Sequence, residues 1–290
     1  MEDIIVIVGP TGVGKTKCSI ELAKRLDAEI INGDSVSIYK ELNIGSAKPT
    51  KEEQENIPHH LLDVKEVEEE YSVYDYQKEV RELIKDIRER GKRIILVGGT
   101  GLYIKAALFD YHFSKEEEVK EYEDLSNEEI YEKLKSFSLE KIPDKNNRRR
   151  LVRLLNKVDQ QEEITYKKDD CLYPIKVIGL TTSREILYER INARVDQMMK
   201  EGLLEEVESL KDKYQHSRIL NSAIGYKEFN QYFDHTKTLI EVVEEIKQNS
   251  RRFAKRQYTF FRNQFDTKWF EVDFDYFQNT IDEILKEIKK

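Results

Sequence analysis

The sequence predicts an α/β fold, in which a parallel β-sheet is flanked by helices and a helical lobe is inserted between two strands. The first observation is an apolar run at 4–8 that leads into a glycine-rich loop and then into a helical segment. The second is the alternation of apolar runs with amphipathic stretches up to residue 110, which is typical of parallel strands joined by crossover helices. The third is the segment 114–168, which is almost wholly polar and has helical periodicity.

The glycine-rich loop has the full GxxxxGK[ST] pattern of a phosphate-binding loop and lies between the strand and the helix that this motif requires. Its glycines let backbone N–H groups converge on phosphate oxygens, and the following helix adds the positive end of its dipole. Lys15 supplies a positive charge, and the Thr16 hydroxyl supplies a ligand for Mg²⁺. The sheet is therefore predicted to be P-loop NTPase-like. The phosphate-binding residues are Gly9, Pro10, Thr11, Gly12, Val13, Gly14, Lys15 and Thr16.

The remaining elements follow from local patterns along the chain. Strands are predicted where short apolar runs occur, at 28–32, 94–97, 174–180 and 269–272. Helices are predicted from amphipathic periodicity at 15–26, 74–91, 101–108, 128–136, 148–158, 184–200, 202–214 and 238–262, followed by a final helix. At 290 residues the chain suits one α/β core with an insertion. We assign the core to 1–112 and 172–290 and the inserted helical lobe to 113–171.

The chain carries a formal net charge of −8, yet its basic residues are clustered. One cluster lies at 148–157, and the other lies at 251–262, where arginines and aromatic residues alternate at helical spacing. Each cluster fits either a solvated amphipathic helix or a surface that binds nucleic-acid phosphates. No apolar run reaches the length of a membrane span, and there is no room for a signal peptide before the first strand. We therefore expect a cytoplasmic protein that does not associate with a membrane.

Cysteine and histidine give no sign of a disulfide framework or of a transition-metal site. Cys18 and Cys171 are too few and too isolated for either, and we expect both to be packing residues. His59 and His60 are adjacent, but two histidines without a third ligand are more often polar loop or core residues than metal ligands.

The second half of a nucleotide hydrolase, a strand that ends in an Asp to organise Mg²⁺ and water, is not evident. The strands at 94–97 and 174–180 end in Gly-Gly-Thr-Gly and Thr-Thr. Asp34 is the acid placed directly after an early strand, where strand ends meet bound phosphates. These features leave the phosphate compound open, and a small-molecule kinase that uses ATP is one alternative.

Eight blocks of sequence together resemble the bacterial tRNA dimethylallyltransferase family, the isopentenyl transferases that modify tRNA adenosine. In chain order they are GPTGVGKT at 9–16, DSVSIYK at 34–40, IGSAKP at 44–49, PHHLLD at 58–63, VGGTGLY at 97–103, RINARVDQM at 190–198, AIGYKE at 223–228 and AKRQ at 254–257. Many families share a phosphate-binding loop, but this combination in this order is specific. The sequence departs from the family pattern at Ser37, where the family usually has Gln, and at Asn147, where it usually has an acid.

The resemblance implies a prenyl transfer, in which the loop holds the diphosphate of dimethylallyl diphosphate and the adenine N6 amine attacks its C1. It implies that Asp34 is the general base, because an aromatic amine is a poor nucleophile. It also implies that Lys15, Arg194 and Mg²⁺ bound through Thr16 stabilise the departing diphosphate. Arg190 either shares that work or forms a salt bridge on an exposed helix. The implied acceptor is the adenosine immediately 3′ of the anticodon, in the anticodon stem-loop of tRNA.

The resemblance further implies a tRNA-binding surface and a channel into which the target adenine is extruded. Its residues are Asp34, Ser35, Val36, Ser37, Thr100, Arg148, Arg149, Arg252, Lys255 and Arg256. Two more alternatives stay open. An adenylate isopentenyltransferase would use free AMP or ATP and lack the basic lobe, whereas a non-enzymatic RNA-binding module would leave Asp34 without a purpose. We expect the protein to be a monomer.

Overall fold

The computed structural model describes residues 3–111, 120–137, 139–161 and 170–290. The chain divides into a core, formed by Met1–Asp110 with Cys171–Lys290, and a lobe formed by Tyr111–Asp170. The boundaries expected from the sequence, 113 and 171, lie one or two residues from this division.

The core contains a parallel sheet of six strands in the order β3-β2-β4-β1-β5-β6. The strands are β1 (Ile4–Val8), β2 (Ala28–Asn32), β3 (His59–His60), β4 (Arg93–Val97), β5 (Ile175–Thr181) and β6 (Thr267–Glu271). The central strand β1 pairs with β4 on one side, through Ile5 and Ile95, and with β5 on the other. The loop that follows β1 therefore lies at the middle of the carboxyl edge, where parallel α/β sheets bind ligands. The predicted fold class is confirmed, although the two-residue strand β3 was not predicted because it is too short to show a pattern.

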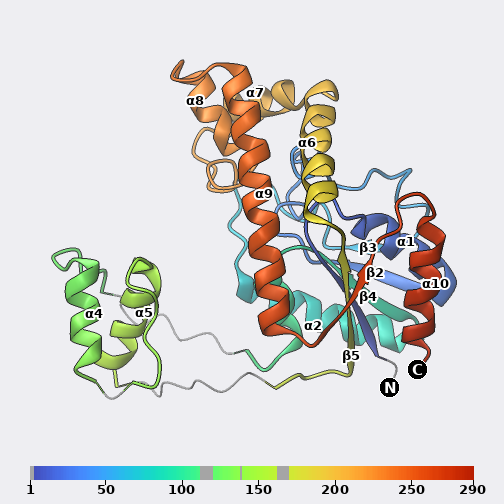
Figure 1. Cartoon of the computed structure of the whole chain (residues 1–290), viewed down its shortest axis with the longest axis horizontal. Helices are drawn as coiled ribbons and strands as arrows, with labels where there is room; N and C mark the ends of the chain where they lie inside the picture. Colours follow the sequence, from blue (N-terminus) through green and yellow to red (C-terminus); the bar gives the residue numbers. More distant parts are fainter. Residues whose placement is uncertain (1–2, 112–119, 138, 162–169) are drawn as a thin grey trace. The chain divides into compact units, whose positions relative to one another are not determined.

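Helices cover both faces of this sheet (Figure 1). The main helices are α1 (Lys15–Leu26), α2 (Val73–Glu89), α3 (Gly101–Leu108), α6 (Arg184–Lys200), α7 (Leu203–Lys213), α9 (Leu239–Gln264) and α10 (Phe277–Ile288). A 3-10 helix, η1 (Lys227–Phe229), and the short helix α8 (Asn230–Phe233) also occur, and the sequence did not predict them. No helix among the described residues is both long enough and apolar enough to cross a lipid bilayer.

The alternation of side chains along β1 divides the core between the two faces of the sheet. Ile4, Val6 and Val8 pack into the cluster that includes residues of α2, α3 and α9. Ile5 and Ile7 pack into the cluster that includes residues of α1 and α10. Each strand residue is fully buried because helices cover both faces, which explains why the sequence shows a continuous apolar run rather than alternation.

The lobe has a small hydrophobic core of its own. Its helices are α4 (Asn127–Lys135) and α5 (Arg148–Asp159), and its core residues are Ile130, Leu134, Leu151, Leu154 and Leu155. A capping box between Ser126 and Glu129 starts α4. Asn147 caps α5, because its side chain accepts a hydrogen bond from the Arg150 N–H. Asn and Asp are equally good caps, so the departure from the family pattern at Asn147 preserves the start of the helix.

Candidate active site

The phosphate-binding loop has a backbone with positive φ angles, which its glycines adopt without strain. Gly9, Gly12 and Gly14 have φ angles of 144°, 80° and 99°. A Cβ atom on Gly9 would lie 2.6 Å from the carbonyl oxygen of Leu180, at the end of β5. Residues with a side chain would not fit this backbone without strain.

The backbone N–H groups of 12–16 donate no hydrogen bond to any described residue. The Thr11 N–H, by contrast, is bound by a side chain of the protein. Free N–H groups at the start of α1 form the kind of site that binds an anion, and the dipole of the helix favours negative charge there.

Lys15 lies at the centre of this loop, where its Nζ donates a hydrogen bond to the Pro10 carbonyl at 2.8 Å. Burial, and to a smaller extent the positive charge of Arg194, lower the pKa of Lys15 to about 8, although the charge of Asp34 partly opposes them. A bound phosphate would raise the pKa again, because its negative charge favours the charged form of the amine.

Thr16 is exposed, and its side-chain hydroxyl has no hydrogen-bond partner among the described residues. It lies in the first turn of α1, next to Lys15. A free hydroxyl beside a phosphate-binding loop fits one ligand position of a Mg²⁺ ion that also binds phosphate oxygens and water.

Asp34 lies two residues beyond β2, and the side chain of Asn32 fixes its backbone. The Asp34 N–H donates to Asn32 Oδ1 at 3.0 Å, and Asn32 Nδ2 donates to the carbonyls of Asp34 and Leu61 at 3.0 and 2.9 Å. One carboxylate oxygen, Oδ1, accepts the Val36 N–H at 2.9 Å. The carboxylate is therefore oriented by the backbone, while the side chain is still partly exposed.

Thr100 joins the turn after β4 to the loop that carries Asp34. Its Oγ1 accepts the Ser35 N–H at 3.1 Å and lies 3.2 Å from Ser35 Oγ, and its N–H donates to the Gly33 carbonyl at 3.1 Å. A Cβ on Gly98 would lie 2.1 Å from the Gly33 carbonyl oxygen, so only glycine permits this approach. The turn after β4 is thus hydrogen-bonded to the residues directly before and directly after Asp34.

Two arginines of α6 reach the same edge of the sheet. Arg190 donates from Nε to the Gly12 carbonyl at 2.9 Å, and its guanidinium lies 4.0 Å from the centre of the Phe274 ring. Arg194 donates from Nη2 to the Ala47 carbonyl at 3.4 Å. Burial lowers the pKa of Arg194, while the charge of Asp34 raises it. Arg190 therefore contacts the phosphate-binding loop directly, and it forms no salt bridge with any residue that the structure describes.

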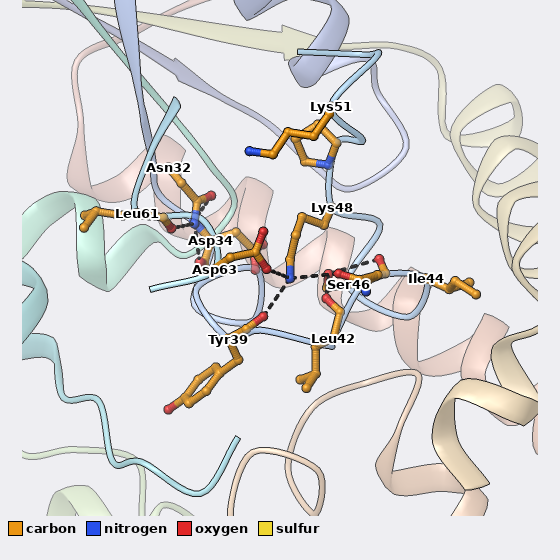
Figure 2. A network of polar contacts seen from close by, with 12 residues as sticks. Asn32, Asp34, Tyr39, Leu42, Ile44, Ser46, Lys48, Lys51, Leu61 and Asp63 are labelled. Carbon is orange, nitrogen blue, oxygen red and sulfur yellow. Dashed lines mark hydrogen bonds and ion pairs between the residues drawn. The ribbon is translucent and has the colours of Figure 1, made fainter. Parts of the chain in front are cut away.

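The IGSAKP segment is held in place by Lys48, whose side chain is 4% exposed. Figure 2 shows its Nζ donating to the Tyr39 carbonyl at 2.7 Å and to Asp63 Oδ1 at 2.6 Å. A third hydrogen bond goes to Asn43 Oδ1 at 3.1 Å. Lys48 is thus a structural cation that joins three of the sequence blocks and positions the carbonyl that Arg194 contacts.

The sequence did not predict that Glu206 and Tyr226 fix the other side of this segment. The Glu206 carboxylate accepts the N–H groups of Asn43, Ile44 and Gly45 at 3.2, 2.9 and 3.1 Å, and it also accepts the Tyr226 hydroxyl at 2.8 Å. A Cβ on Gly45 would lie 2.6 Å from the Tyr226 ring. The sequence blocks at 44–49 and 223–228 therefore pack against each other in the fold.

The basic residues predicted to bind tRNA have different surroundings. Arg252, Lys255 and Arg256 are exposed on α9, and none forms an ion pair with another described residue. Arg148 is partly buried, and its guanidinium donates to the carbonyls of Tyr122 and Leu125 within the lobe. Arg148 therefore stabilises the lobe, whereas Arg149 is exposed; their contact with tRNA stays a prediction.

The other predicted residues are also located. Ser35 and Val36 are partly exposed beside Asp34, but Ser37 is buried and 5% exposed. His60 lies 2.6 Å from Glu29, and His59 lies 2.8 Å from the Ile57 carbonyl. Cys18 is buried in the core, as expected of a packing residue, and burial raises its pKa to about 12. Cys171 is exposed, so the expectation that it is a packing residue is wrong.

Three comparisons with known proteins agree with one another. A family model described as IPP transferase matches residues 37–264. A tRNA dimethylallyltransferase of Anoxybacillus flavithermus is 49% identical over 301 residues, which span 99% of this chain and 96% of the relative. One of Bacillus cereus is 46% identical over 287 residues, or 93% of this chain and 90% of the relative.

Solved structures show the same similarity. A tRNA isopentenylpyrophosphate transferase of Staphylococcus epidermidis matches with a TM-score of 0.76 and 38% identity, covering 100% of this chain and 99% of that one. A eukaryotic dimethylallyltransferase acting on tRNA matches with a TM-score of 0.80 and 26% identity, covering 98% and 78%. Because the family model covers most of the chain and the curated relatives match nearly all of it, the chain belongs to the IPP transferase family.

Proposed function

We propose that the protein transfers the dimethylallyl group of dimethylallyl diphosphate to N6 of the adenosine immediately 3′ of the anticodon in tRNA, with release of diphosphate. The observation that carries this proposal is that the phosphate-binding loop after β1 and Asp34 after β2 lie at the same carboxyl edge of the sheet, on either side of the turn after β4. The charge of Asp34 raises the pKa of both Lys15 and Arg194, against the lowering by burial, so both cations lie near this carboxylate. One site therefore combines a carboxylate base with cations for a leaving diphosphate.

The diphosphate is bound by the free N–H groups of 12–16 together with Lys15. As the C1–O bond breaks, negative charge grows on the diphosphate, and Lys15 and Arg194 stabilise it. Arg190, which contacts the loop at Gly12, supplies a third positive charge. Thr16 would hold a Mg²⁺ ion, which would supply further positive charge next to the diphosphate.

Asp34 acts at the acceptor. The N6 nitrogen forms a bond to C1 of the dimethylallyl group, the C1–O bond to diphosphate breaks, and the proton lost from N6 passes to the Asp34 carboxylate. The Val36 N–H orients this carboxylate through Oδ1, which leaves Oδ2 to receive the proton. Ser35 and Thr100 lie beside Asp34 and contact the extruded adenosine.

The tRNA backbone is bound by exposed cations. Arg252, Lys255 and Arg256 on α9 contact phosphates, and Arg149 in the lobe contributes to the same binding. We expect the protein to act as a monomer in the cytoplasm, where its tRNA substrate is found.

The test is the incorporation of labelled dimethylallyl diphosphate, with Mg²⁺, into unmodified tRNA, beside reactions with AMP or ATP as acceptor. Label in tRNA alone, at the adenosine next to the anticodon, is the expected result. Label in free nucleotide would instead indicate an adenylate isopentenyltransferase. Absence of transfer to either acceptor, with phosphoryl transfer from ATP, would indicate a kinase.

The role of Asp34 is tested by Asp34→Asn, which keeps the size of the side chain and removes its basicity. The transfer rate is expected to fall by roughly 10² to 10⁴, while tRNA binding changes little. Asp27→Asn is the matched control, because Asp27 precedes β2, has a φ of 49° that Asn tolerates, and lies at the opposite end of α1 from the phosphate-binding loop. Turnover that persists in Asp34→Asn would show that Asp34 is not the base.

A further inference from the structure

Gln257 joins the phosphate-binding loop to the turn after β4. It lies on α9, is 4% exposed, and uses both ends of its amide. Its Oε1 accepts the Thr11 N–H of the phosphate-binding loop at 3.0 Å, and its Nε2 donates to the Gly99 carbonyl at 3.1 Å. Gly99 belongs to the turn after β4, so a single side chain connects this turn to the loop after β1.

We propose that Gln257 is a positioning residue, which fixes the distance between the bound diphosphate and the general base. The proposal rests on the function proposed above. The turn at Gly99 continues into Thr100, whose N–H and hydroxyl are bonded on both sides of Asp34. Gln257 therefore links Thr11, through this turn, to the backbone that orients the Asp34 carboxylate.

The fit around Gln257 is close. A Cβ on Gly99 would lie 2.1 Å from Gln257 Nε2 and 3.9 Å from Asp34 Oδ2. Two residues further along, a Cβ on Gly101 would lie 2.2 Å from the Phe260 ring, which is also on α9. The two glycines thus let α9 approach the turn, and Gln257 occupies the space that a side chain at Gly99 would take.

The chemistry requires an amide at this position. Thr11 needs an acceptor and Gly99 needs a donor, and a neutral carboxamide supplies both from one planar group. Without it, a backbone donor and a backbone acceptor in the site would lose their partners. Within 11–16, Thr11 alone has an N–H that donates to a described residue, so the Gln257 carbonyl oxygen occupies the acceptor position at the edge of the loop.

Three variants test the proposal. Gln257→Met keeps the length of the side chain and removes both hydrogen bonds. Gln257→Glu keeps the acceptor for Thr11, but when ionised it has no proton to donate to Gly99 and repels that carbonyl. Gln264→Glu is the matched control, because Gln264 is on the same helix and accepts from Lys105 Nζ at 3.1 Å, a contact that a carboxylate preserves.

The measurement is kcat, together with KM for tRNA, between about pH 6 and 9, normalised to the folded fraction from circular dichroism at the assay temperature. Burial raises the pKa of a carboxyl group introduced at this position above its ordinary value, so the low end of this range favours its protonated form. Asp34, Lys15, Arg190 and Arg194 are charged groups that share the site. They are present in every variant, so each rate is expressed relative to wild type at the same pH.

We expect Gln257→Met to lower kcat by roughly tenfold at every pH, with KM for tRNA unchanged. We expect Gln257→Glu to lose more activity at high pH and to recover toward low pH, and Gln264→Glu to match wild type. A kcat for Gln257→Met equal to that of the control would overturn the proposal, as would a pH-independent ratio for Gln257→Glu. If Gln257→Glu does not fold, Gln257→Met decides alone. Absence of transfer by wild type would instead refute the proposed function.

Discussion

At the scale of single residues, Lys15 is the group whose charge depends most on the site around it. Its amine is desolvated beside Arg194, so its pKa is lowered from 10.5 to about 8. In the folded chain it therefore binds its proton more weakly than in the unfolded chain. This destabilises the fold at pH below about 8, and the effect is relieved as the pH rises toward 10.5. Binding of a diphosphate, by contrast, favours the protonated, positively charged form of Lys15.

We therefore predict that kcat/KM for dimethylallyl diphosphate falls as the pH rises above about 8, where Lys15 loses its charge in the free enzyme. Lys15→Arg is expected to have a lower maximum, because the guanidinium does not reproduce the geometry of the amine, but no decline in this range. The check is the pH profile of kcat/KM for both proteins. A decline at the same pH in Lys15→Arg would show that another group causes it.

At the scale of elements, α9 serves two purposes on its two sides. Its buried residues include Val242, Ile246, Ala254, Gln257 and Phe261, at the spacing of one helical face. Its exposed side carries Arg252, Lys255 and Arg256. A polar residue on an otherwise apolar face was the sequence signal that could have identified Gln257, although the pattern could not show which atoms it meets.

Replacement of Arg252, Lys255 and Arg256 together by Ala is predicted to weaken tRNA binding and to reduce its dependence on salt. Each lost phosphate contact should reduce the slope of log K against log salt by about 0.7 to 0.9. Titration of tRNA at several salt concentrations measures this slope. The control is Ala at Lys286, Lys289 and Lys290, which are exposed at the end of α10 and change the net charge equally. An equal change in slope for both triple variants would show that α9 makes no specific phosphate contact.

At the scale of the whole molecule, the lobe is inserted where two segments of the core, before and after the lobe, pair with each other. Phe109 and Cys171 form an antiparallel bridge, and the Leu172 N–H donates to the Leu108 carbonyl at 2.9 Å. The two ends of the insertion therefore meet on the core, and the lobe has its own hydrophobic centre. An arrangement of this kind permits removal of the lobe without opening the sheet.

We predict that replacement of 111–170 by a short glycine-serine linker leaves a folded core that still binds dimethylallyl diphosphate. Transfer to tRNA should become weaker, with KM for tRNA raised by roughly tenfold or more, because basic residues that bind phosphate are lost. Calorimetry with the diphosphate and kinetics with tRNA measure the two properties separately. An unchanged KM for tRNA would contradict a role of the lobe in binding.

The sequence predicted much of this architecture because its signals are local. The buried run at 4–8, the glycines of the loop and the amphipathic periods each act within a few residues, and the structure has strands and helices at these places. The strand at His59–His60 and the short helices at 227–233 were missed, because they are formed by pairing and packing with distant segments.

By itself, therefore, the sequence determined a parallel sheet with a phosphate-binding loop and the insertion of a helical lobe. It also identified Lys15, Asp34 and Arg194 as candidate active-site residues. Tertiary structure alone decided that Lys48 and Glu206 hold a loop in place, that Arg148 is bound within the lobe, and that Gln257 joins Thr11 to Gly99. The reason is physical: a motif specifies local backbone geometry, whereas the partner of a buried polar group depends on residues that only folding brings within hydrogen-bonding distance.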